Sequence, residues 1–474
     1  MGKYIHKFDT VSEFNDYRNE NYKQPWLSYT VENDNVDYNW YTPEEYELRT
    51  VPFTIKALGS GNITWALTDG KTITYSKNGD EYQTWDGTTA INVVEGDSIS
   101  FIGNNDNYSE NVITSTANYE VFGNLYSIIS EDFLNEQPYT ERVFRRLFYG
   151  SETLLYSDKL ILSRIQTSRA CYQGLFRNCI NLKTAPKLEA LNAARSCYNT
   201  MFMGCSSLIE APELPATTLA GYSYNSMFCD CTSLTKAPEI LPAISVPENA
   251  YGVMFAQTAI TKAPKILATI LGPSACISMF QNCANLKIAC SSFAPVTVDS
   301  NSCYTMFSGC TSLVEGPAIL PATTLAEQCY MAMFQHCESL IKAPILPATT
   351  LANGCYRSMF VFCYSLVTVP ELPATTLASN CYQNMFSCCT SITTAPVLPA
   401  TTLATYCYKY IFTYCSNLNH VTCLATDISA TECTSKWFEG ASSTGTFEKA
   451  SGMSSWTTGV SGIPEGWTVE TATE

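Results

Sequence analysis

The sequence has few histidines and no long apolar run. Only three histidines occur in 474 residues. His6, His336 and His420 lie far from any Ser, Cys or Asp pattern typical of a nucleophile and its base. No uncharged apolar stretch reaches the ~20 residues that span a bilayer, and the N-terminus lacks the apolar core of a secretion signal. We therefore expect no membrane insertion, no Sec-type export and no histidine-dependent catalysis.

Basic residues are also scarce, and the acidic excess lies at the front of the chain. Lys and Arg number 27 against 43 Asp and Glu, a formal net charge of −16. Residues 1–140 hold 8 Lys/Arg and 22 Asp/Glu, whereas residues 141–474 hold 19 and 21. Such a balance argues against nucleic acid or an anionic membrane surface as the partner.

An internal repeat organises about two thirds of the chain. A Met-Phe pair, or Leu-Phe or Ile-Phe in its place, recurs every 25 to 27 residues. The phenylalanines of these pairs are Phe176, Phe202, Phe228, Phe255, Phe280, Phe307, Phe334, Phe360, Phe386 and Phe412. A further step of 26 residues reaches Trp437-Phe438, and a degenerate first copy is Leu147-Phe148. Repeats of this length indicate a solenoid, in which each unit buries its apolar face against its neighbours.

The best-formed unit, Cys329 to Ala352, reads Cys-Tyr-x-x-Met-Phe-x-x-Cys-x-Ser-Leu-x-x-Ala-Pro-x-Leu-Pro-Ala-Thr-Thr-Leu-Ala. We expect a short strand around Ser-Leu-x-x-Ala-Pro, closed by its proline, to stack at ~4.8 Å spacing. The Cys-Tyr-x-x-Met-Phe-x-x-Cys segment has apolar residues at i, i+1, i+4, i+5 and i+8, which favours a short helical turn. The leucines of the strands should form one buried column: Leu182, Leu208, Leu234, Leu340 and Leu366. The predicted fold is mainly β with short helical turns, a leucine-rich-repeat-like solenoid.

The repeat unit resembles a known family. With the ending Thr-Gly-Thr-Phe-x-Lys-Ala and Gly-Ile-Pro-x-Gly-Trp-Thr-Val, it is similar to BspA-like leucine-rich repeat proteins of gut Bacteroidales and their phages. The resemblance covers residues 140–474. It implies a leucine-rich-repeat fold and a role in adhesion or display, with partners that differ from member to member.

The front of the chain predicts a separate β domain. Short β-branched runs alternate with Gly, Asn and Asp turn signals between residues 50 and 135. The expected strands are residues 53–57, 63–65, 72–75, 91–94 and 98–102. Strands at this pitch favour a small β-sandwich or jelly-roll-like domain.

Residues 1–49 are acidic and aromatic but poor in aliphatic side chains, so we expect them to order against another molecule. The candidate docking residues are Trp26, Tyr29, Trp40 and Tyr41. The stretch Gln24 to Asn33 is similar to N-terminal segments of virion-attached proteins from gut crAss-like phages. This resemblance implies docking to other virion proteins.

All 22 cysteines lie at or after Cys171, and 16 of them occupy two repeat columns. Three repeats have cysteine in the second column but not in the first. In these repeats Cys231, Cys283 and Cys310 are accompanied by Ser223, Ala275 and Ser302 at the first position. Free replacement by small residues favours a buried ladder of thiols over disulfides that close each repeat. Repeat-spanning disulfides remain the alternative.

Neither a metal nor a cofactor is expected. Structural zinc needs four convergent ligands and usually a Cys-x-x-Cys pair, and Cys229-Asp230-Cys231 is too closely spaced. A glycosidase needs paired carboxylates, but Glu315, Glu338 and Glu371 are scattered. We predict a protein that is not an enzyme.

One repeat column offers a candidate binding surface. Seven residues after the first cysteine position stand His336, Phe362, Cys388 and Tyr414 on four successive repeats. Further aromatic residues lie nearby: Tyr364, Tyr406 and Tyr410. Aromatic side chains at a regular rise suit stacking on sugars or on a protein partner. The alternative is that they only pack against the next turn.

These observations predict four parts: a docking segment (1–49), a small β domain (50–139), the solenoid (140–440) and a C-terminal cap (441–474). The expected function is a non-enzymatic phage virion protein, a head or tail appendage that displays the solenoid to host or gut glycans or proteins. The rival is a bacterial cell-surface adhesin that binds host matrix or mucin. The sequence leaves homo-oligomerisation open.

Overall fold

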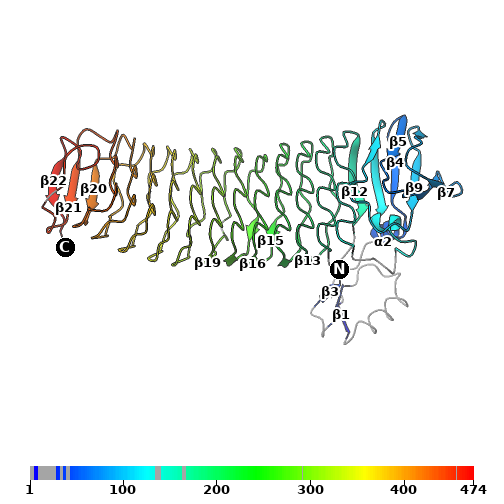
Figure 1. The fold of residues 1–474 in the computed structure, drawn as a ribbon, viewed down its shortest axis with the longest axis horizontal. Coiled ribbons are helices and arrows are strands. Elements are labelled where there is room, and N and C mark those ends of the chain that lie inside the picture. The colour runs from blue at the N-terminus through cyan, green and yellow to red at the C-terminus, as the bar shows by residue number, and fades with distance from the viewer. Residues whose placement is uncertain are drawn as a thin grey trace.

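The computed structural model describes residues 5–8, 28–31, 36–38, 43–133, 140–162, 167–290, 292–454 and 456–473. It is a long rod with a β domain at one end and a small three-stranded sheet at the other (Figure 1). The solenoid runs between these ends. In the parts of the chain that are described, no helix has the length and apolarity to cross a bilayer.

The first described elements are three strands and a helix. Strand β2 (Ser28–Val31) pairs parallel with β1 (Ile5–Phe8) and antiparallel with β3 (Val36–Tyr38). Helix α2 (Pro43–Thr50) follows. Of the predicted docking residues, Trp26, Trp40 and Tyr41 lie outside the described residues, and only the backbone of Tyr29, in β2, is described.

The β domain is a sandwich of two sheets. The strands of the larger sheet lie in the order β12-β11-β4-β9-β6-β7 and those of the smaller in the order β10-β5-β8. Trp65 of the smaller sheet meets Phe101 of the larger edge-on, with ring centroids 5.4 Å apart. Five of the strands match the runs predicted from sequence: β4 (Thr54–Ala57), β5 (Gly61–Trp65), β6 (Ile73–Lys77), β8 (Ile91–Val93) and β9 (Ser98–Ile102). The others are β7 (Gln83–Trp85), β10 (Ile113–Ser115), β11 (Tyr119–Asn124) and β12 (Leu154–Ile161).

The core of the β domain continues into the solenoid without a break. A short 3-10 helix, η1 (Leu125–Ile128), leads out of β11, and β12 then pairs parallel with β11. The rings of Phe53 and Phe148 lie 5.9 Å apart, and the hydroxyls of Tyr126 and Tyr172 are 2.9 Å apart. The sandwich therefore covers the first rung of the solenoid and buries its apolar end.

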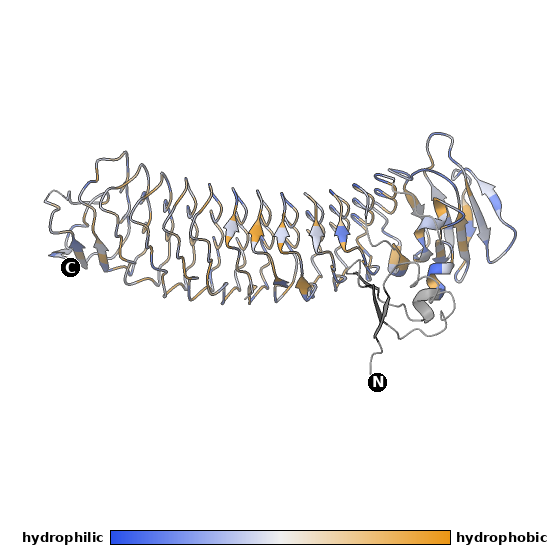
Figure 2. Cartoon of the chain, turned by 90° about the horizontal axis from the view of Figure 1, so that it is seen from below, coloured by the Kyte–Doolittle hydropathy of each residue, from blue (hydrophilic) through white to orange (hydrophobic). Residues whose placement is uncertain are grey.

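Each rung of the solenoid contributes very short parallel strands. They stack as single bridges or as two-residue ladders and stand side by side along the rod (Figure 2). The two-residue strands are β13 (Asn192–Ala193), β14 (Thr218–Leu219), β15 (Ile240–Leu241), β16 (Ser245–Val246), β17 (Lys265–Ile266), β18 (Ile270–Leu271) and β19 (Thr297–Val298). The predicted leucine column is confirmed, since Leu182, Leu208, Leu234, Leu340 and Leu366 are fully buried.

The Cys-Tyr-x-x-Met-Phe-x-x-Cys segment is not the helical turn that its spacing favours. It is a ribbon of successive β-turns, with two residues inward and two outward. In one rung Met359 N–H donates to the Tyr356 carbonyl and Cys363 N–H to the Phe360 carbonyl, within the turns. Phe360 N–H donates instead to Met385 of the next rung. Alternate amides thus bond along the ribbon and across rungs, which a helix cannot do.

This ribbon demands a positive φ at every fourth residue. Twelve rungs each have three such residues, as in Gly354, Ser358 and Phe362 (φ 61°, 58° and 63°). They occupy the third position of a turn, where type II turns favour Gly or Asn. We call these positions the first, second and third left-handed positions of a rung.

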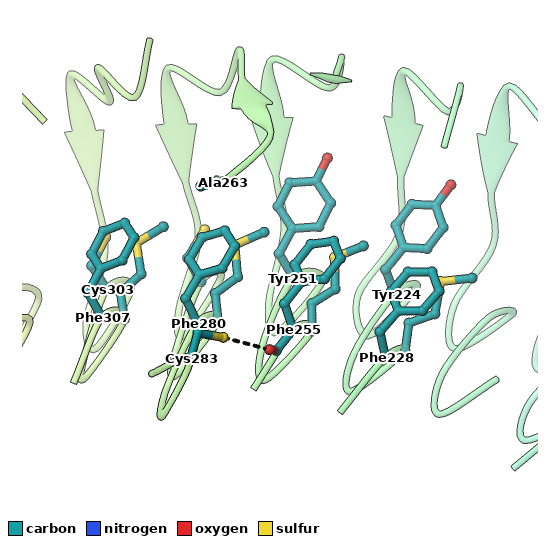
Figure 3. Close-up of a cluster of buried hydrophobic side chains, with 14 of the residues drawn as sticks. Tyr224, Phe228, Tyr251, Phe255, Ala263, Phe280, Cys283, Cys303 and Phe307 are labelled. Carbon is teal, nitrogen blue, oxygen red and sulfur yellow. Dashed lines mark hydrogen bonds between the residues drawn. The ribbon is translucent and has the colours of Figure 1, made fainter. Parts of the chain in front are cut away.

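The interior of the ribbon is a ladder of phenylalanines. Twelve of them, from Phe148 to Phe438, stack with centroids 5.3–5.9 Å apart and rings within 15° of parallel. Part of this ladder is drawn in Figure 3. A tyrosine ladder runs beside it and is interrupted where Cys276 and Cys303 replace tyrosine. It resumes at Tyr330.

The second cysteine column hydrogen-bonds to the phenylalanine ladder. Nine cysteines donate Sγ–H to the Phe carbonyl of the preceding rung at 2.9–3.2 Å, as Cys283 does to Phe255 (Figure 3). Thr258 takes the cysteine position in one rung, but its hydroxyl donates within that rung, to the Phe255 carbonyl at 2.8 Å. All 22 cysteines are free thiols, and every one except Cys388 is buried.

The C-terminal end closes the rod. Strands β20 (His420–Cys423), β21 (Thr446–Lys449) and β22 (Thr468–Thr471) form a parallel sheet. Trp437 stacks on Trp456 with centroids 5.4 Å apart, and Trp467 lies 5.4 Å from Phe438. These rings cover the last phenylalanine of the ladder, as an end cap requires.

Candidate binding edge

The predicted aromatic column lies along one edge of the solenoid. We call His336, Phe362, Tyr364, Cys388 and Tyr414 the aromatic edge. His336 stacks on Phe362 with ring centroids 4.4 Å apart, and Tyr364 meets Phe362 at 6.1 Å. The edge crosses three rung spacings, or ~14 Å at the spacing of parallel strands.

The aromatic edge is exposed to solvent but incompletely. Tyr414 is 55% exposed and Tyr364 41%, whereas His336, Phe362 and Cys388 are half-buried. The stacked rings of His336 and Phe362 cover part of one another. The outer faces remain open to a ligand, and the edge is a shallow surface.

The backbone under this edge is unusual for its residues. His336, Phe362, Cys388 and Tyr414 occupy third left-handed positions, with φ between 58° and 63°. Earlier rungs fill the same column mostly with Gly, Asn or Asp, which tolerate this conformation. The residues are Gly150, Asn178, Gly204, Asp230, Gln257, Asn282 and Gly309. A left-handed φ costs an ordinary side chain ~1–2 kcal/mol. Because every rung carries three left-handed residues, the feature particular to this column is the size of its side chains in a conformation that favours small ones.

Tyr406 and Tyr410 lie on the same rung as Tyr414, at its first and second left-handed positions. Lys409 Nζ lies over both rings, 4.9 Å from the Tyr406 centroid and 5.2 Å from the Tyr410 centroid. Lys409 also forms an ion pair with Glu432 of the next rung. The hydrogen bond to Glu432 raises the pKa of Lys409, so the ammonium stays charged between the rings.

The ring of Tyr414 is supported by the next rung. Gly440 has φ 73°, and a β-carbon there would lie 2.5 Å from Cδ1 of Tyr414. The glycine thus serves both the left-handed backbone and the close approach of the ring. Asn178 and Asn282 pack in the same way against Gly204 and Gly309, which shows that this is a recurring contact of the column.

A groove beside β11 and β12 is the other concave feature of note. Its volume is about 220 Å³, and Glu120, Tyr156, Asp158 and Lys159 line it. Both carboxylates have partners: Glu120 pairs with Lys56 at 3.4 Å, and Asp158 accepts from the Thr184 hydroxyl at 2.6 Å. The groove offers no free pair of carboxylates for acid–base work.

The thiols and histidines show no catalytic arrangement in the described part of the chain. Burial raises the pKa of Cys179 to about 12 and that of Cys423 to about 12, which disfavours the thiolate a nucleophile needs. His420 lies 3.8 Å from Glu448, and His336 is stacked on Phe362. Nor do three His, Cys, Asp or Glu side chains converge to hold a metal ion among the described residues.

Sequence reasoning found the rings but missed the residues that support them. Lys409, Glu432 and Gly440 follow no motif, and Glu432 lies 23 residues from Lys409. Only the register between rungs brings them to the tyrosines. A repeat alignment that marks left-handed positions would have placed Tyr406, Tyr410 and Tyr414 on one rung.

Comparison with known proteins gives one structural likeness. No family model and no curated protein matches the chain. The crystal structure of a leucine-rich repeat protein from Bacteroides ovatus ATCC 8483 is similar over 64% of this chain and 81% of that chain, at 14% sequence identity and a TM-score of 0.28. The solenoid fold is therefore assigned from the stacked rungs and side-chain ladders of this chain.

Proposed function

We propose that this chain is a non-enzymatic binding protein that presents the aromatic edge of its solenoid to a ligand. One observation carries the proposal: three bulky ring side chains, His336, Phe362 and Tyr414, occupy third left-handed positions where earlier rungs have Gly, Asn, Asp or, once, Gln. The fold does not need rings there, since the ribbon forms with small residues. A function at the surface accounts for both their strain and their exposure.

A binding role fits the rest of the molecule. The recurring thiols serve packing and hydrogen bonds to phenylalanine carbonyls. The aromatic edge is flat and open, and its residues come from rigid, stacked rungs. Rigid aromatic groups lose little entropy on binding, which favours recognition.

We further propose that the solenoid is carried on a phage particle as a head or tail appendage and contacts host or gut surface. The support is the resemblance of the repeat and of residues 24–33 to proteins of gut phages, and a rod shape with the candidate edge far from the β domain (Figure 1). Residues 1–49 would dock to other virion proteins. A bacterial surface adhesin is the competing assignment.

Two measurements test this function. Mass spectrometry of purified particles and of host cell envelopes should find the chain in the particles. Recovery from envelopes alone would replace the virion assignment by the adhesin.

Adhesion of the full chain to immobilised gastric mucin should fall in Phe362→Asn and Tyr414→Asn. It should persist in the control Gln257→Asn, which alters the third left-handed position of a rung without an aromatic edge. Equal adhesion of all variants would refute the edge as the contact surface.

A further inference from the structure

One rung differs from all others in what it places at its left-handed positions. Tyr406, Tyr410 and Tyr414 have φ of 57°, 61° and 59°. Among the twelve described rungs, none of the others has more than one aromatic residue at these positions. We call these three residues the tyrosine rung. Tyr414 also belongs to the aromatic edge, so the rung and the edge meet at a corner.

The rings of the tyrosine rung are fixed before any ligand arrives. Lys409 is held over Tyr406 and Tyr410, and its side chain is only 19% exposed. Glu432 anchors Lys409 from the next rung. The backbone of Gly440 supports the third ring. Three pre-oriented rings lower the entropy cost of binding to their outer faces.

The charge at this rung excludes a strongly anionic ligand. Glu432 neutralises Lys409, and the described part of the next rung supplies Glu439, paired with Lys436 at 3.4 Å. Residues 201–474 contain 9 Lys/Arg and 17 Asp/Glu. A sulfated or nucleic-acid ligand would find no net positive field here.

The polar groups around the rings suit hydroxyl-rich ligands. The Glu432 side chain is 48% exposed and can accept hydrogen bonds beside its ion pair. The tyrosine hydroxyls can donate and accept. A pyranose offers an apolar C–H face for the rings and hydroxyls for these groups. A protein partner needs ~800 Å² of well-packed contact on each side, which a shallow corner of three rings does not supply.

We propose that the tyrosine rung is a carbohydrate subsite for uncharged hexose or N-acetylhexosamine units. The rings stack on sugar faces, and Glu432 accepts from sugar hydroxyls. Lys409 is a positioning residue that orients two rings. This inference rests on the proposed binding function and names its ligand class.

The test compares three forms of gastric mucin as immobilised probes for the full chain: intact, desialylated, and stripped of O-glycans. We expect equal or tighter binding after desialylation and loss of binding after stripping. Tyr410→Asn should weaken binding about tenfold, because it removes a central anchor. Asn suits the left-handed backbone, so the rung should stay folded. Lys409→Met should weaken binding less and Lys409→Arg should restore it.

The matched control is Tyr222→Asn. Tyr222 is also left-handed and also lies under a cation, with Arg195 5.0 Å from its ring, but it stands alone on its rung. Its variant should bind like the parent. Binding that survives removal of all O-glycans yet falls in Tyr414→Asn would overturn the carbohydrate class and keep the edge as a binding surface. Binding unchanged in every tyrosine variant, or no binding to intact mucin, would overturn the subsite.

Discussion

The imidazole of His336 lies on the ring of Phe362 with centroids 4.4 Å apart, closer than any two rings of the buried phenylalanine ladder. The two residues are 26 positions apart and meet because each occupies the same left-handed position of neighbouring rungs. The stacking offsets part of the strain in both backbones. It also makes one continuous, half-exposed surface from residues distant in sequence.

Replacing an edge tyrosine should separate stability from binding. Tyr414→Asn removes a 55% exposed ring from a left-handed position and introduces a residue that tolerates it. We expect the free energy of unfolding to stay equal or rise by ~0.5–1 kcal/mol, the usual gain from relieving such strain, while mucin adhesion falls. Urea denaturation and adhesion assays on the same preparation check this. A large loss of stability would mean that the ring serves the fold.

The support of Tyr414 by Gly440 can be tested without touching the tyrosine. Gly440→Ala would place a β-carbon 2.5 Å from Cδ1 of Tyr414 and should displace the ring and weaken adhesion. Gly150→Ala is the matched control, because Gly150 has the same third position with φ 71° and open space around its α-carbon. Both variants should lose ~1 kcal/mol from backbone strain. Equal adhesion of the two would show that the ring does not need this support.

The cysteines should differ in their reactivity toward alkylation: one is reactive, and the buried ladder is protected. Of the 22 cysteines only Cys388 is not buried, and burial raises the pKa of the ladder thiols, for example that of Cys355 to about 12. Iodoacetamide at neutral pH should therefore modify Cys388 alone in the native protein, and all 22 after non-reducing denaturation. Mass spectrometry reads both states. Disulfide-linked peptides in the denatured sample would contradict the ladder.

Much of this fold follows from the sequence. The recurring Met-Phe pair gave the rung length, and Leu208 or Leu340 lies in the buried column that the repeat predicts. Small residues opposite Cys231 and Cys310 indicated packing thiols, and the free, buried sulfurs agree. These inferences succeeded because burial between identical neighbours leaves a strict period in the sequence.

The local conformation of the repeat could not be read from apolar spacing. Positions i, i+1, i+4, i+5 and i+8 fit a helix of period 3.6 and a ribbon of period 4 almost equally over nine residues. A local sign of the ribbon was Gly or Asn four residues apart, as in Gly174 and Asn178, but other rungs place residues such as Arg142, Thr200 and Val253 at these positions. Contacts such as Lys409 to Glu432 depend on the register between rungs, which no local pattern records.

Removal of the N-terminal segment should separate attachment from folding. Deleting residues 1–42 keeps α2, whose Arg49 pairs with Glu189 at 2.5 Å and whose backbone accepts from Asn124. The solenoid should keep its melting temperature, because each rung contacts mainly its neighbours. Incorporation into particles should be lost, and Trp26→Ala should weaken it. Normal incorporation of the shortened chain would place the anchor elsewhere.

The most direct test of the binding edge uses Cys388 as a reporter within it. We predict that saturating gastric mucin slows the alkylation of native Cys388 about tenfold, because the ligand covers the rings on either side, and that Tyr414→Asn abolishes this protection. An unchanged alkylation rate in protein that is demonstrably bound to mucin would contradict the account, since the ligand would then sit away from the aromatic edge.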